Sequence, residues 1–204
     1  MIWPVYGVDV HVKRLRPTPS TERLIELYPT PHDHRLYGRG HHERVEATIA
    51  LAAEWLPTPL VSIADLSCGN GEIAVRLCPS GERHLGDIAM LPAELDANGL
   101  KYFGPIEQTI SLLDEVQAFV CSETLEHLEE PWYVLAQIRR HAEHLVLSTP
   151  LECWDDGNAE HLWAWNQPGV EHLLGMAGWS MRAFTTVDAR VYDETYLYGI
   201  WVCQ

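Results

Sequence analysis

The stretch that decides the fold is VSIADLSCGNGEIAVRLC, residues 61–78. VSIAD is a short apolar run rich in β-branched residues, which is typical of a buried strand. GEIAVRLC carries the apolar spacing of a helix. Between them lies a turn with Gly69 and Gly71, where the missing side chains let the backbone approach a ligand closely. The sequence therefore predicts a strand, a ligand-binding turn and a helix, in this order.

The same alternation continues toward the C-terminus. We expect further strands and helices at residues 83–87 (strand), 92–98 (helix), 102–104 (strand), 118–122 (strand), 131–141 (helix), 144–149 (strand) and 168–176 (helix). Two last strands, residues 180–187 and 196–203, follow each other without a helix and should form a hairpin. The pattern predicts an α/β, Rossmann-like fold. Its seven-stranded sheet is mostly parallel, carries helices on both faces and closes with an antiparallel C-terminal hairpin.

The first 40 residues have a different character. Five of the 13 prolines fall within the first 31 residues, so we expect an irregular extension or lid with one short helix near residues 20–28. Residues 41–56 place their apolar side chains on one face of a helix that Pro57 ends. The predicted organisation is an N-terminal extension, residues 1–40, followed by one domain, residues 41–204.

Charge and cysteine content limit the function classes. The chain has 14 Lys and Arg against 29 Asp and Glu, a formal net charge of −15, which disfavours a nucleic-acid partner. The five cysteines are widely spaced and form no C-x-x-C pair, so no disulfide framework or zinc cluster is expected. No segment reads as a signal peptide or membrane span. We expect a cytoplasmic protein with a small-molecule partner; the sequence does not indicate its oligomeric state.

The glycine turn is expected to bind a ligand that contains a nucleoside. In an open α/β sheet, ligands bind beyond the carboxyl ends of the strands. Asp87 ends the next strand, at the distance where a carboxylate can accept hydrogen bonds from ribose hydroxyls. Two ligands fit: S-adenosylmethionine (SAM), whose carboxylate would meet the helix N-terminus, and a dinucleotide, because residues 69–74 also match G-x-G-x-x-A. Asp65 before the turn and the terminal hairpin favour SAM.

Four segments match the motifs of a known family, in the same order along the chain: ADLSCGNGEIA (64–74), HLGDI (84–88), FVCSETLEHLEEP (119–131) and LVLSTP (145–150). Through them the chain, from about residue 60 onward, resembles the class I SAM-dependent methyltransferases. The branch that contains the ubiquinone-biosynthesis O-methyltransferases is the most similar. The family's function, and its seven-stranded fold, become expectations for this chain.

The resemblance implies a set of cofactor contacts. Those expected near the methionine portion, the ribose and the adenine are, in chain order, Asp65, Ser67, Cys68, Gly69, Asn70, Gly71, Asp87, Ile88 and Ile106. The sequence departs from the family at Gly104-Pro105, where an acidic residue usually meets the adenine. From the N-terminal side we expect Tyr37, His41 and Arg44 to close over the cofactor, with Arg44 as the charge partner of the methionine carboxylate.

A group of carboxylates and histidines follows the strand at residues 118–122. Glu123, Glu126 and His127 are spaced i, i+3 and i+4, so they would share one face of a helix. Together with His161 they suit Mg²⁺, as in the plant small-RNA 2′-O-methyltransferases, which this segment also resembles. Without a metal, His127 or His161 can act as general base, and Glu123 is expected at the methyl-transfer edge. In relatives that bind no metal, the histidine of this segment packs or caps.

Two further groups have two interpretations each. The histidines His32, His34, His41 and His42 suggest either a metal site or, as we favour, a solvated loop. Three tryptophans between the last parallel strand and the next helix suggest either an aromatic wall for the acceptor or ordinary packing: Trp154, Trp163 and Trp165.

The sequence as a whole predicts a SAM-dependent methyltransferase that acts on an oxygen or nitrogen of a small molecule. The N-P-P-Y type of motif found in DNA-base methyltransferases is absent. Two alternatives remain open. The first is an NAD-dependent dehydrogenase that uses the same glycine turn, and the second is a SAM-binding module without catalytic turnover.

Overall fold

The computed structural model of the chain describes residues 2–5, 8–33, 38–93, 95 and 99–204. Its main element is a sheet with the strand order β5-β4-β3-β6-β7-β10-β9. In chain order these strands are β3 (Ser62–Asp65), β4 (Glu82–Asp87), β5 (Leu100–Phe103), β6 (Val116–Ser122), β7 (Ala142–Leu151), β9 (Met181–Asp188) and β10 (Leu197–Cys203). The strands from β5 to β7 pair in parallel, whereas β10 pairs antiparallel with both β7 and β9. The predicted seven-stranded sheet with its terminal hairpin is confirmed.

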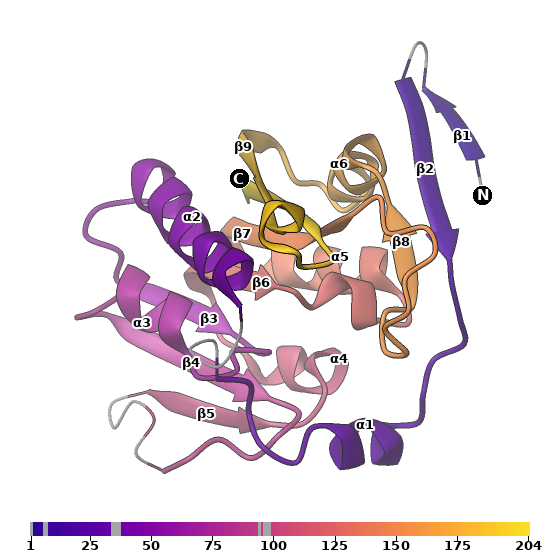
Figure 1. The fold of residues 1–204 in the computed structure, drawn as a ribbon. Coiled ribbons are helices and arrows are strands. Elements are labelled where there is room, and N and C mark those ends of the chain that lie inside the picture. The colour runs from indigo at the N-terminus through magenta and orange to yellow at the C-terminus, as the bar shows by residue number, and fades with distance from the viewer. Residues whose placement is uncertain (1, 6–7, 34–37, 94, 96–98) are drawn as a thin grey trace.

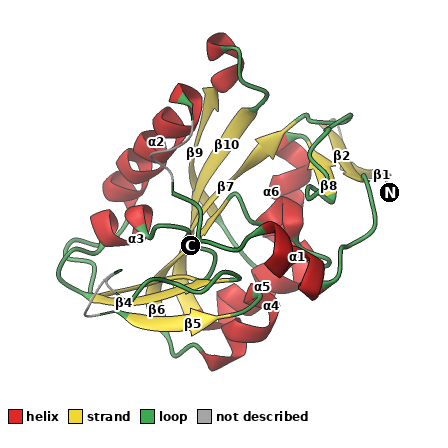
Figure 2. Ribbon diagram, turned by 60° about the horizontal axis from the view of Figure 1, so that its bottom comes forward, coloured by secondary structure: helices red, strands yellow, loops and turns green. Residues whose placement is uncertain are grey.

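Helices cover both faces of this sheet. Those described are α1 (Thr21–Leu27), α2 (Arg39–Trp55), α3 (Glu72–Leu77), α4 (Ile106–Thr109), α5 (Pro131–His141) and α6 (Gln167–Met176), with 3-10 turns η2 (Ile110–Leu112), η3 (Leu125–His127) and η4 (Ala189–Tyr192). Figure 2 shows α2 and α3 on one side of the strands and α4, α5 and α6 on the other. No helix in the described part of the chain is long and apolar enough to cross a bilayer.

Alternation along the central strands builds two separate cores. Phe119, Leu145 and Trp201 face α5 and α6 in one apolar cluster. Their sequence neighbours Val120 and Val146 face α2 and α3 in the other. Because successive side chains of a strand point to opposite faces, each central strand contributes to both cores, which explains its nearly continuous apolar sequence.

The N-terminal segment contains a second, smaller sheet. Strands β1 (Ile2–Val5) and β2 (Val8–Arg14) form an antiparallel pair, and β2 also pairs with β8 (Trp163–Trp165). Figure 1 shows β2 between β1 and β8, at the far end of the fold from β3 and β4. The expectation of an irregular extension with one helix is therefore wrong for these residues, although α1 forms as predicted. Strand β2 does have a strand pattern in the sequence, because VDVHVKR alternates apolar and polar residues. The nearby prolines had favoured an irregular chain.

Another local expectation differs from the structure. A helix was expected at residues 92–98, but Pro92, Ala93 and Leu95 are not helical. The other residues of that range, 94 and 96–98, lie outside the described part. The remaining helices begin and end within two residues of the expected positions, and α5 matches its expected range.

Candidate active site

The glycine turn lies between β3 and α3, as expected. Gly69 and Gly71 have φ angles of 54° and 71°, in the left-handed region that favours glycine. The Gly69 N–H donates to Oδ2 of Asp87 at 2.9 Å, and the Ala89 N–H donates to Oδ1 at 2.9 Å. The carboxylate that was expected to meet a ribose is thus fixed at the end of β4, directly beside the turn.

Asp65, at the end of β3, lies beneath the turn. It is 3% exposed, and its Oδ1 accepts a hydrogen bond from the Ser67 N–H at 3.2 Å. Burial raises the pKa of Asp65 to about 8, against the lowering effect of that hydrogen bond. Ser67 Oγ and Thr124 Oγ1 lie 2.5 Å apart, so the turn is also joined to the segment after β6.

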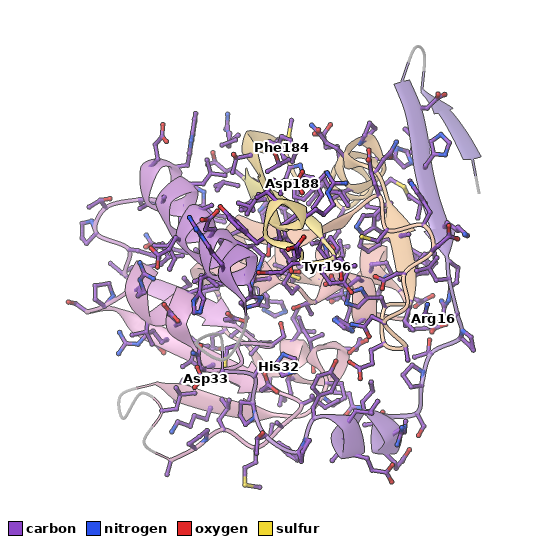
Figure 3. All side chains as sticks on the ribbon, viewed as in Figure 1. Arg16, His32, Asp33, Phe184, Asp188 and Tyr196 are labelled. Carbon is purple, nitrogen blue, oxygen red and sulfur yellow. The ribbon has the colours of Figure 1, made fainter. Side chains whose placement is uncertain are left out.

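Residues of the N-terminal segment lie on the same turn. A Cβ atom on Gly69 would come within 2.7 Å of the His32 carbonyl oxygen, and Asn70 Nδ2 donates to Oδ1 of Asp33 at 3.1 Å (Figure 3). The pKa of His32 is lowered by burial, while the neighbouring Asp87 charge acts in the opposite direction. His32 and Asp33 therefore belong to the candidate cofactor site, although His32 was expected in a metal site or a solvated loop and Asp33 was not indicated.

The other expected cofactor contacts have mixed surroundings. Cys68 is buried, and burial raises the pKa of its thiol well above the usual value. Ile88 is half-buried beside Asp87. Ile106 is 5% exposed and belongs to the core between α4 and β6, so most of its surface packs against protein. Tyr37 lies outside the described residues.

Arg44 lies at the ends of two central strands. Its side chain is fully buried, and one terminal nitrogen donates to Ser122 Oγ at 2.5 Å and to Ser148 Oγ at 3.1 Å. The other terminal nitrogen lies 3.1 Å from His41 Nε2, and Nε lies 3.9 Å from Oε1 of Glu123. Arg44 therefore contacts the ends of β6 and β7, and its nearest carboxylate is Glu123. A contact with the methionine carboxylate stays a prediction.

Glu123 follows β6 in a strained backbone conformation. Its φ angle is 53°, in the left-handed region, and its N–H donates to the Ser148 carbonyl oxygen at 2.9 Å. The Ser148 hydroxyl donates to Oε1 of Glu123 at 2.8 Å. Burial raises the pKa of Glu123, while the charge of Arg44 acts to lower it. Non-glycine residues in this region are often found at functional sites, which agrees with the expected position at the sheet edge.

Glu126, His127 and His161 meet at one point, as the sequence predicted. Each offers one ligand atom, and these atoms all lie within 4.8 Å of one another. The segment is a single 3-10 turn, η3, and not the α-helical face that the spacing suggested. Glu123, the fourth expected ligand, does not join the group because its carboxylate is directed to Ser148 and Arg44.

The two histidines are held in defined orientations. His127 Nδ1 lies 3.1 Å from the Glu160 carbonyl oxygen, which can only accept, so this nitrogen carries the proton. His161 Nδ1 lies 2.6 Å from Oδ2 of Asp156. Each ring thus uses Nδ1 for this contact and has Nε2 left for a ligand. Burial lowers the pKa of His127 to about 3, so its imidazole is neutral.

Glu126 is the most unusual member of this group. Its Oε2 accepts from Thr149 Oγ1 at 3.0 Å, but its buried Oε1 has no hydrogen-bond partner and lies 3.9 Å from His127 Nε2. Burial, followed by the charge of Glu123, raises the pKa of Glu126 well above its usual value. An unpaired carboxylate oxygen in the interior is costly unless a proton or a cation compensates it.

Asp156 is a site residue that the sequence did not indicate. Besides His161, its carboxylate accepts from the Asn158 N–H at 2.8 Å and from the Tyr196 hydroxyl at 3.3 Å. Tyr196 comes from the segment just before β10, and Figure 3 shows it near the centre of the molecule. Asp156 lies in the sequence Asp-Asp-Gly-Asn, residues 155–158. Its partner Tyr196 is 40 residues away, so no local pattern could reveal the contact.

The three tryptophans do not form one wall. Trp165 is fully buried in the core and donates to Thr149 Oγ1 at 3.2 Å. Trp163 donates to the Leu128 carbonyl oxygen at 2.8 Å and lies beneath the Arg14 guanidinium. Trp154 lines a cavity to which the other two do not contribute. The packing interpretation therefore holds for the strand β8, and the acceptor interpretation is restricted to the loop before it.

The expected histidine loop is divided between two places. His32 lies near the glycine turn, and His41 contacts Arg44 from helix α2. His42 also lies on α2, and His34 is outside the described residues. Within the described part of the chain, the group that can hold a metal ion is the one formed by Glu126, His127 and His161.

Comparison with known proteins gives structural likeness without sequence likeness. No protein-family profile matches the sequence, and no curated protein is significantly similar to it. Magnesium protoporphyrin IX methyltransferase from Synechocystis PCC 6803, solved with S-adenosylhomocysteine (SAH), is 17% identical with a TM-score of 0.63, over 80% of this chain and 83% of that chain. The N-methyltransferase NodS from Bradyrhizobium japonicum WM9, also with SAH, is 13% identical with a TM-score of 0.68, over 90% and 97%.

A third similar structure has another activity. The [4+2]-cyclase SpnF is 14% identical with a TM-score of 0.67, over 92% of this chain and 97% of that chain. None of the three is named as a ubiquinone-biosynthesis O-methyltransferase, so that branch stays a prediction. At this level of identity the likeness shows the fold: the chain has the Rossmann-like fold of the class I SAM-dependent methyltransferases.

Proposed function

We propose that this chain is a cytoplasmic, SAM-dependent methyltransferase that transfers a methyl group to an oxygen or nitrogen of a small-molecule acceptor. The observation that carries the proposal is the junction of the glycine turn with Asp87. Gly69 needs its positive φ to bring its N–H to the Asp87 carboxylate, and this places both at the carboxyl edge of neighbouring parallel strands. Ligands of open α/β sheets bind at this edge.

The residues at this edge have distinct roles in the proposal. When bound, SAM supplies a methyl group already activated by its sulfonium. The turn at residues 67–71 holds the methionine portion, and Asp87 accepts from the ribose. His32 and Asp33 cover the turn and exclude water from it. Because methyl transfer requires mainly alignment of the donor and the acceptor, this fixed geometry supplies most of what the chain must contribute.

Glu123 and the two histidines are the proposed acceptor side. Glu123 is held by Ser148 and Arg44 at the end of β6, next to the segment that contacts the turn through Thr124. His161 presents Nε2 because Asp156 engages its Nδ1. In the metal-free protein, this Nε2 is the proposed acceptor for the proton of the attacking group.

We also propose that Glu126, His127 and His161 bind a divalent cation. The donor set fits, because one ligand atom from each of the three residues lies within 4.8 Å of the others, Glu126 Oε1 has no hydrogen-bond partner, and both Nδ1 atoms are engaged elsewhere. Two imidazoles and one carboxylate favour a transition-metal ion over the Mg²⁺ expected from the sequence. A bound ion would lower the pKa of an acceptor hydroxyl.

A cobalt titration tests the metal proposal without requiring activity. Co²⁺ should produce visible d–d absorption at one equivalent in the wild type. His161→Ala should abolish it, and the exposed His11→Ala should leave it unchanged. Absence of saturable Co²⁺ absorption in the wild type would leave His161 with the general-base role alone.

Calorimetric titration of the purified chain with SAH and with NADH tests the cofactor. We expect saturable binding of SAH at one site and no binding of NADH, and Asp87→Ala should weaken SAH binding by about tenfold or more, the effect of losing one charge-assisted contact. Tighter binding of NADH than of SAH would overturn the proposal and favour the dehydrogenase.

A SAM-binding protein without methyl transfer is the second candidate. It is favoured by the likeness to a [4+2]-cyclase and by Gly104-Pro105 at a usual adenine contact. Release of SAH from SAM in the presence of an acceptor panel separates the two. Release that depends on both the acceptor and Asp87 supports the methyltransferase, whereas SAH binding without any release across the panel supports the silent module.

A further inference from the structure

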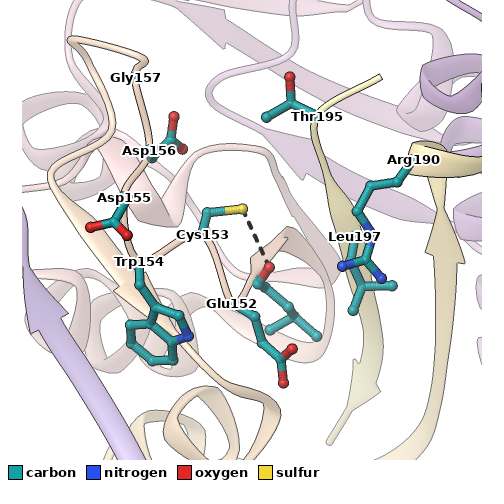
Figure 4. A pocket seen from close by; sticks show the side chains of 10 residues that line it. Glu152, Cys153, Trp154, Asp155, Asp156, Gly157, Arg190, Thr195 and Leu197 are labelled. Carbon is teal, nitrogen blue, oxygen red and sulfur yellow. Dashed lines mark hydrogen bonds between the residues drawn. The ribbon is translucent and has the colours of Figure 1, made fainter. Parts of the chain in front are cut away.

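A cavity of about 300 Å³ opens at the same edge of the sheet, beside the carboxylates and histidines (Figure 4). One wall is the loop that follows β7, with Glu152, Trp154 and Asp155. The opposite wall comes from η4 and the start of β10, with Arg190 and Leu197. The cavity therefore lies between the last parallel strand and its antiparallel neighbour, next to the position proposed for the reaction.

Two shared residues join the cavity to the proposed reaction site. Asp156 lines the cavity and holds His161 through Oδ2. Cys153 also lines it, and the pKa of its thiol is raised to about 12 by burial and further by the charges of Asp156, Glu126 and Glu123. These carboxylates act on Cys153 because they lie close to the cavity. A molecule in the cavity would thus be adjacent to the carboxylate and histidine side chains.

The charges on the cavity lining are mainly negative. Glu152 and Asp155 are exposed, and Asp156 adds a third carboxylate from within the wall. The one cation of the lining is Arg190, and Asp188 already accepts from its Nε at 2.7 Å and from a terminal nitrogen at 2.8 Å. The hydrogen bond to Asp188 raises the pKa of Arg190, and the charge of Glu152 acts in the same direction. The lining nevertheless carries three carboxylates against one guanidinium, so the field inside the cavity is negative.

Two other cations approach the loop from outside the cavity. Lys13 Nζ donates to the Trp154 carbonyl oxygen at 2.9 Å, and a terminal nitrogen of Arg16 donates to the Asp156 carbonyl oxygen at 2.5 Å. Both bonds reach the main chain and fix the position of the loop. Neither side chain belongs to the cavity lining. The rigid loop keeps the Trp154 ring at the wall, where an aromatic face attracts a cation.

We propose that this cavity is the acceptor site and that it selects a small molecule bearing a cationic group, such as a protonated or quaternary amine. The inference rests on the proposed methyltransferase function and adds the substrate class. The cation lies against Trp154 between Glu152 and Asp155. The group to be methylated extends from it toward Glu123 and His161. A neutral or anionic acceptor gains nothing from these carboxylates and is disfavoured.

Choline and its neutral isostere 3,3-dimethylbutanol test this selection, because they differ in charge and share the hydroxyl and the shape. Their binding is followed through the indole N–H signal of Trp154 in ¹H–¹⁵N correlation spectra, which Trp154→Phe assigns. We expect choline to shift this signal saturably and to bind at least about tenfold more tightly than the alcohol, and high salt should reduce this difference by screening.

Isosteric variants show which carboxylates are responsible. The pair Glu152→Gln and Asp155→Asn should reduce choline affinity by about fivefold or more and leave the alcohol unchanged. The matched control combines Glu54→Gln and Asp114→Asn, which are exposed carboxylates away from the cavity lining, and should bind choline like the wild type.

Equal binding of the two probes, no shift of the Trp154 signal, or an equal loss of affinity in the control variant would each overturn the cation site. SAH binding, measured in the same samples, separates this result from the cofactor. Normal SAH binding without selection for choline refutes the substrate class alone, whereas loss of SAH binding refutes the methyltransferase itself and the inference that rests on it.

Discussion

Two regions of the same sheet edge are constructed in different ways. The glycine-turn region, residues 62–89, is joined by hydrogen bonds between main-chain N–H groups and the carboxylates of Asp65 and Asp87. The carboxylate–histidine region, residues 122–165, is joined by side chains that are far apart in sequence, such as Glu126 with Thr149 and His161 with Asp156. The first region lies within 28 residues of sequence, whereas the second also needs Arg44 from helix α2.

This difference determines what each region tolerates. Main-chain N–H groups are present whatever the sequence, so the glycine-turn region depends on backbone conformation and on two acidic residues. The carboxylate–histidine region depends on the identity of every partner, because removing one leaves another polar group buried without a hydrogen bond. Substitutions should therefore cost the most free energy of unfolding in the second region.

Arg44→Met should give the largest effect. It removes the cation beside Glu123 and the hydrogen bonds that Arg44 donates to Ser122 and Ser148, so we expect a loss of about 4 kcal/mol in the free energy of unfolding. Arg39→Met on the same helix is the control, because Arg39 is exposed and should change stability by less than about 1 kcal/mol. Urea unfolding measures both. Equal losses would remove the contrast between the two regions.

Asp65→Asn should change the pH dependence of stability in the glycine-turn region. The pKa of Asp65 is raised from 3.8 to about 8 by burial, so the folded state keeps the proton while the unfolded state releases it. The wild type should lose about 1.4 kcal/mol per pH unit, or about 3 kcal/mol between pH 5 and pH 7, relative to the variant. Above pH 8 the difference should become constant. Parallel stability curves across this range would show that Asp65 is not held protonated.

Gly69→Ala tests the backbone basis of the glycine-turn region. A φ of 54° is unfavourable for alanine, and its Cβ would lie 2.7 Å from the His32 carbonyl oxygen, so we expect a loss of about 2 kcal/mol and at least tenfold weaker SAH binding. Gly175→Ala in α6 meets no atom within 4 Å and should preserve both quantities. Thermal unfolding and calorimetry measure them. Unchanged SAH affinity would show that the turn does not contact the cofactor.

Asn166→Ala should have the smallest effect. Asn166 caps α6 by accepting from the Gly169 N–H at 2.9 Å, and it joins the N-terminal strand by donating to the Asp9 carbonyl oxygen at 2.7 Å. We expect a loss of about 1 kcal/mol. Ser20→Ala, which removes the cap of the exposed helix α1, should leave global unfolding unchanged. A larger loss for Ser20→Ala would show that α1 is part of the cooperative core.

The sequence could predict most of the sheet because its signals are local. Residues 61–78 contain a strand, a turn and a helix in direct succession, and the apolar strands β6, β7 and β10 can be recognised one at a time. The glycine-turn contact with Asp87 could be predicted because the two residues belong to consecutive strands. The N-terminal strands were missed because prolines nearby suggested an irregular chain and their partner β8 is only three residues long.

The carboxylate–histidine region could be predicted only in part. Of the four residues expected to group there, Glu126, His127 and His161 do lie together, whereas Glu123 does not join them. The protein partners of Arg44 could not be predicted, because Ser122 and Ser148 come together only through the pairing of β6 with β7. Asp156 was missed for the same reason, because tertiary packing and not local pattern creates its contacts.

The pairing of β2 with β8 has a consequence for synthesis of the chain. The hydrogen bond from the His11 N–H to Asn166 joins residues separated by 155 positions. At ribosomal rates of about 5–20 residues per second, the N-terminal strand waits roughly 8–30 s before its partner has been translated. Strand β2 is thus made long before it can dock on the rest of the fold, and a nascent chain released before Trp163 lacks the strand β8 against which β2 pairs.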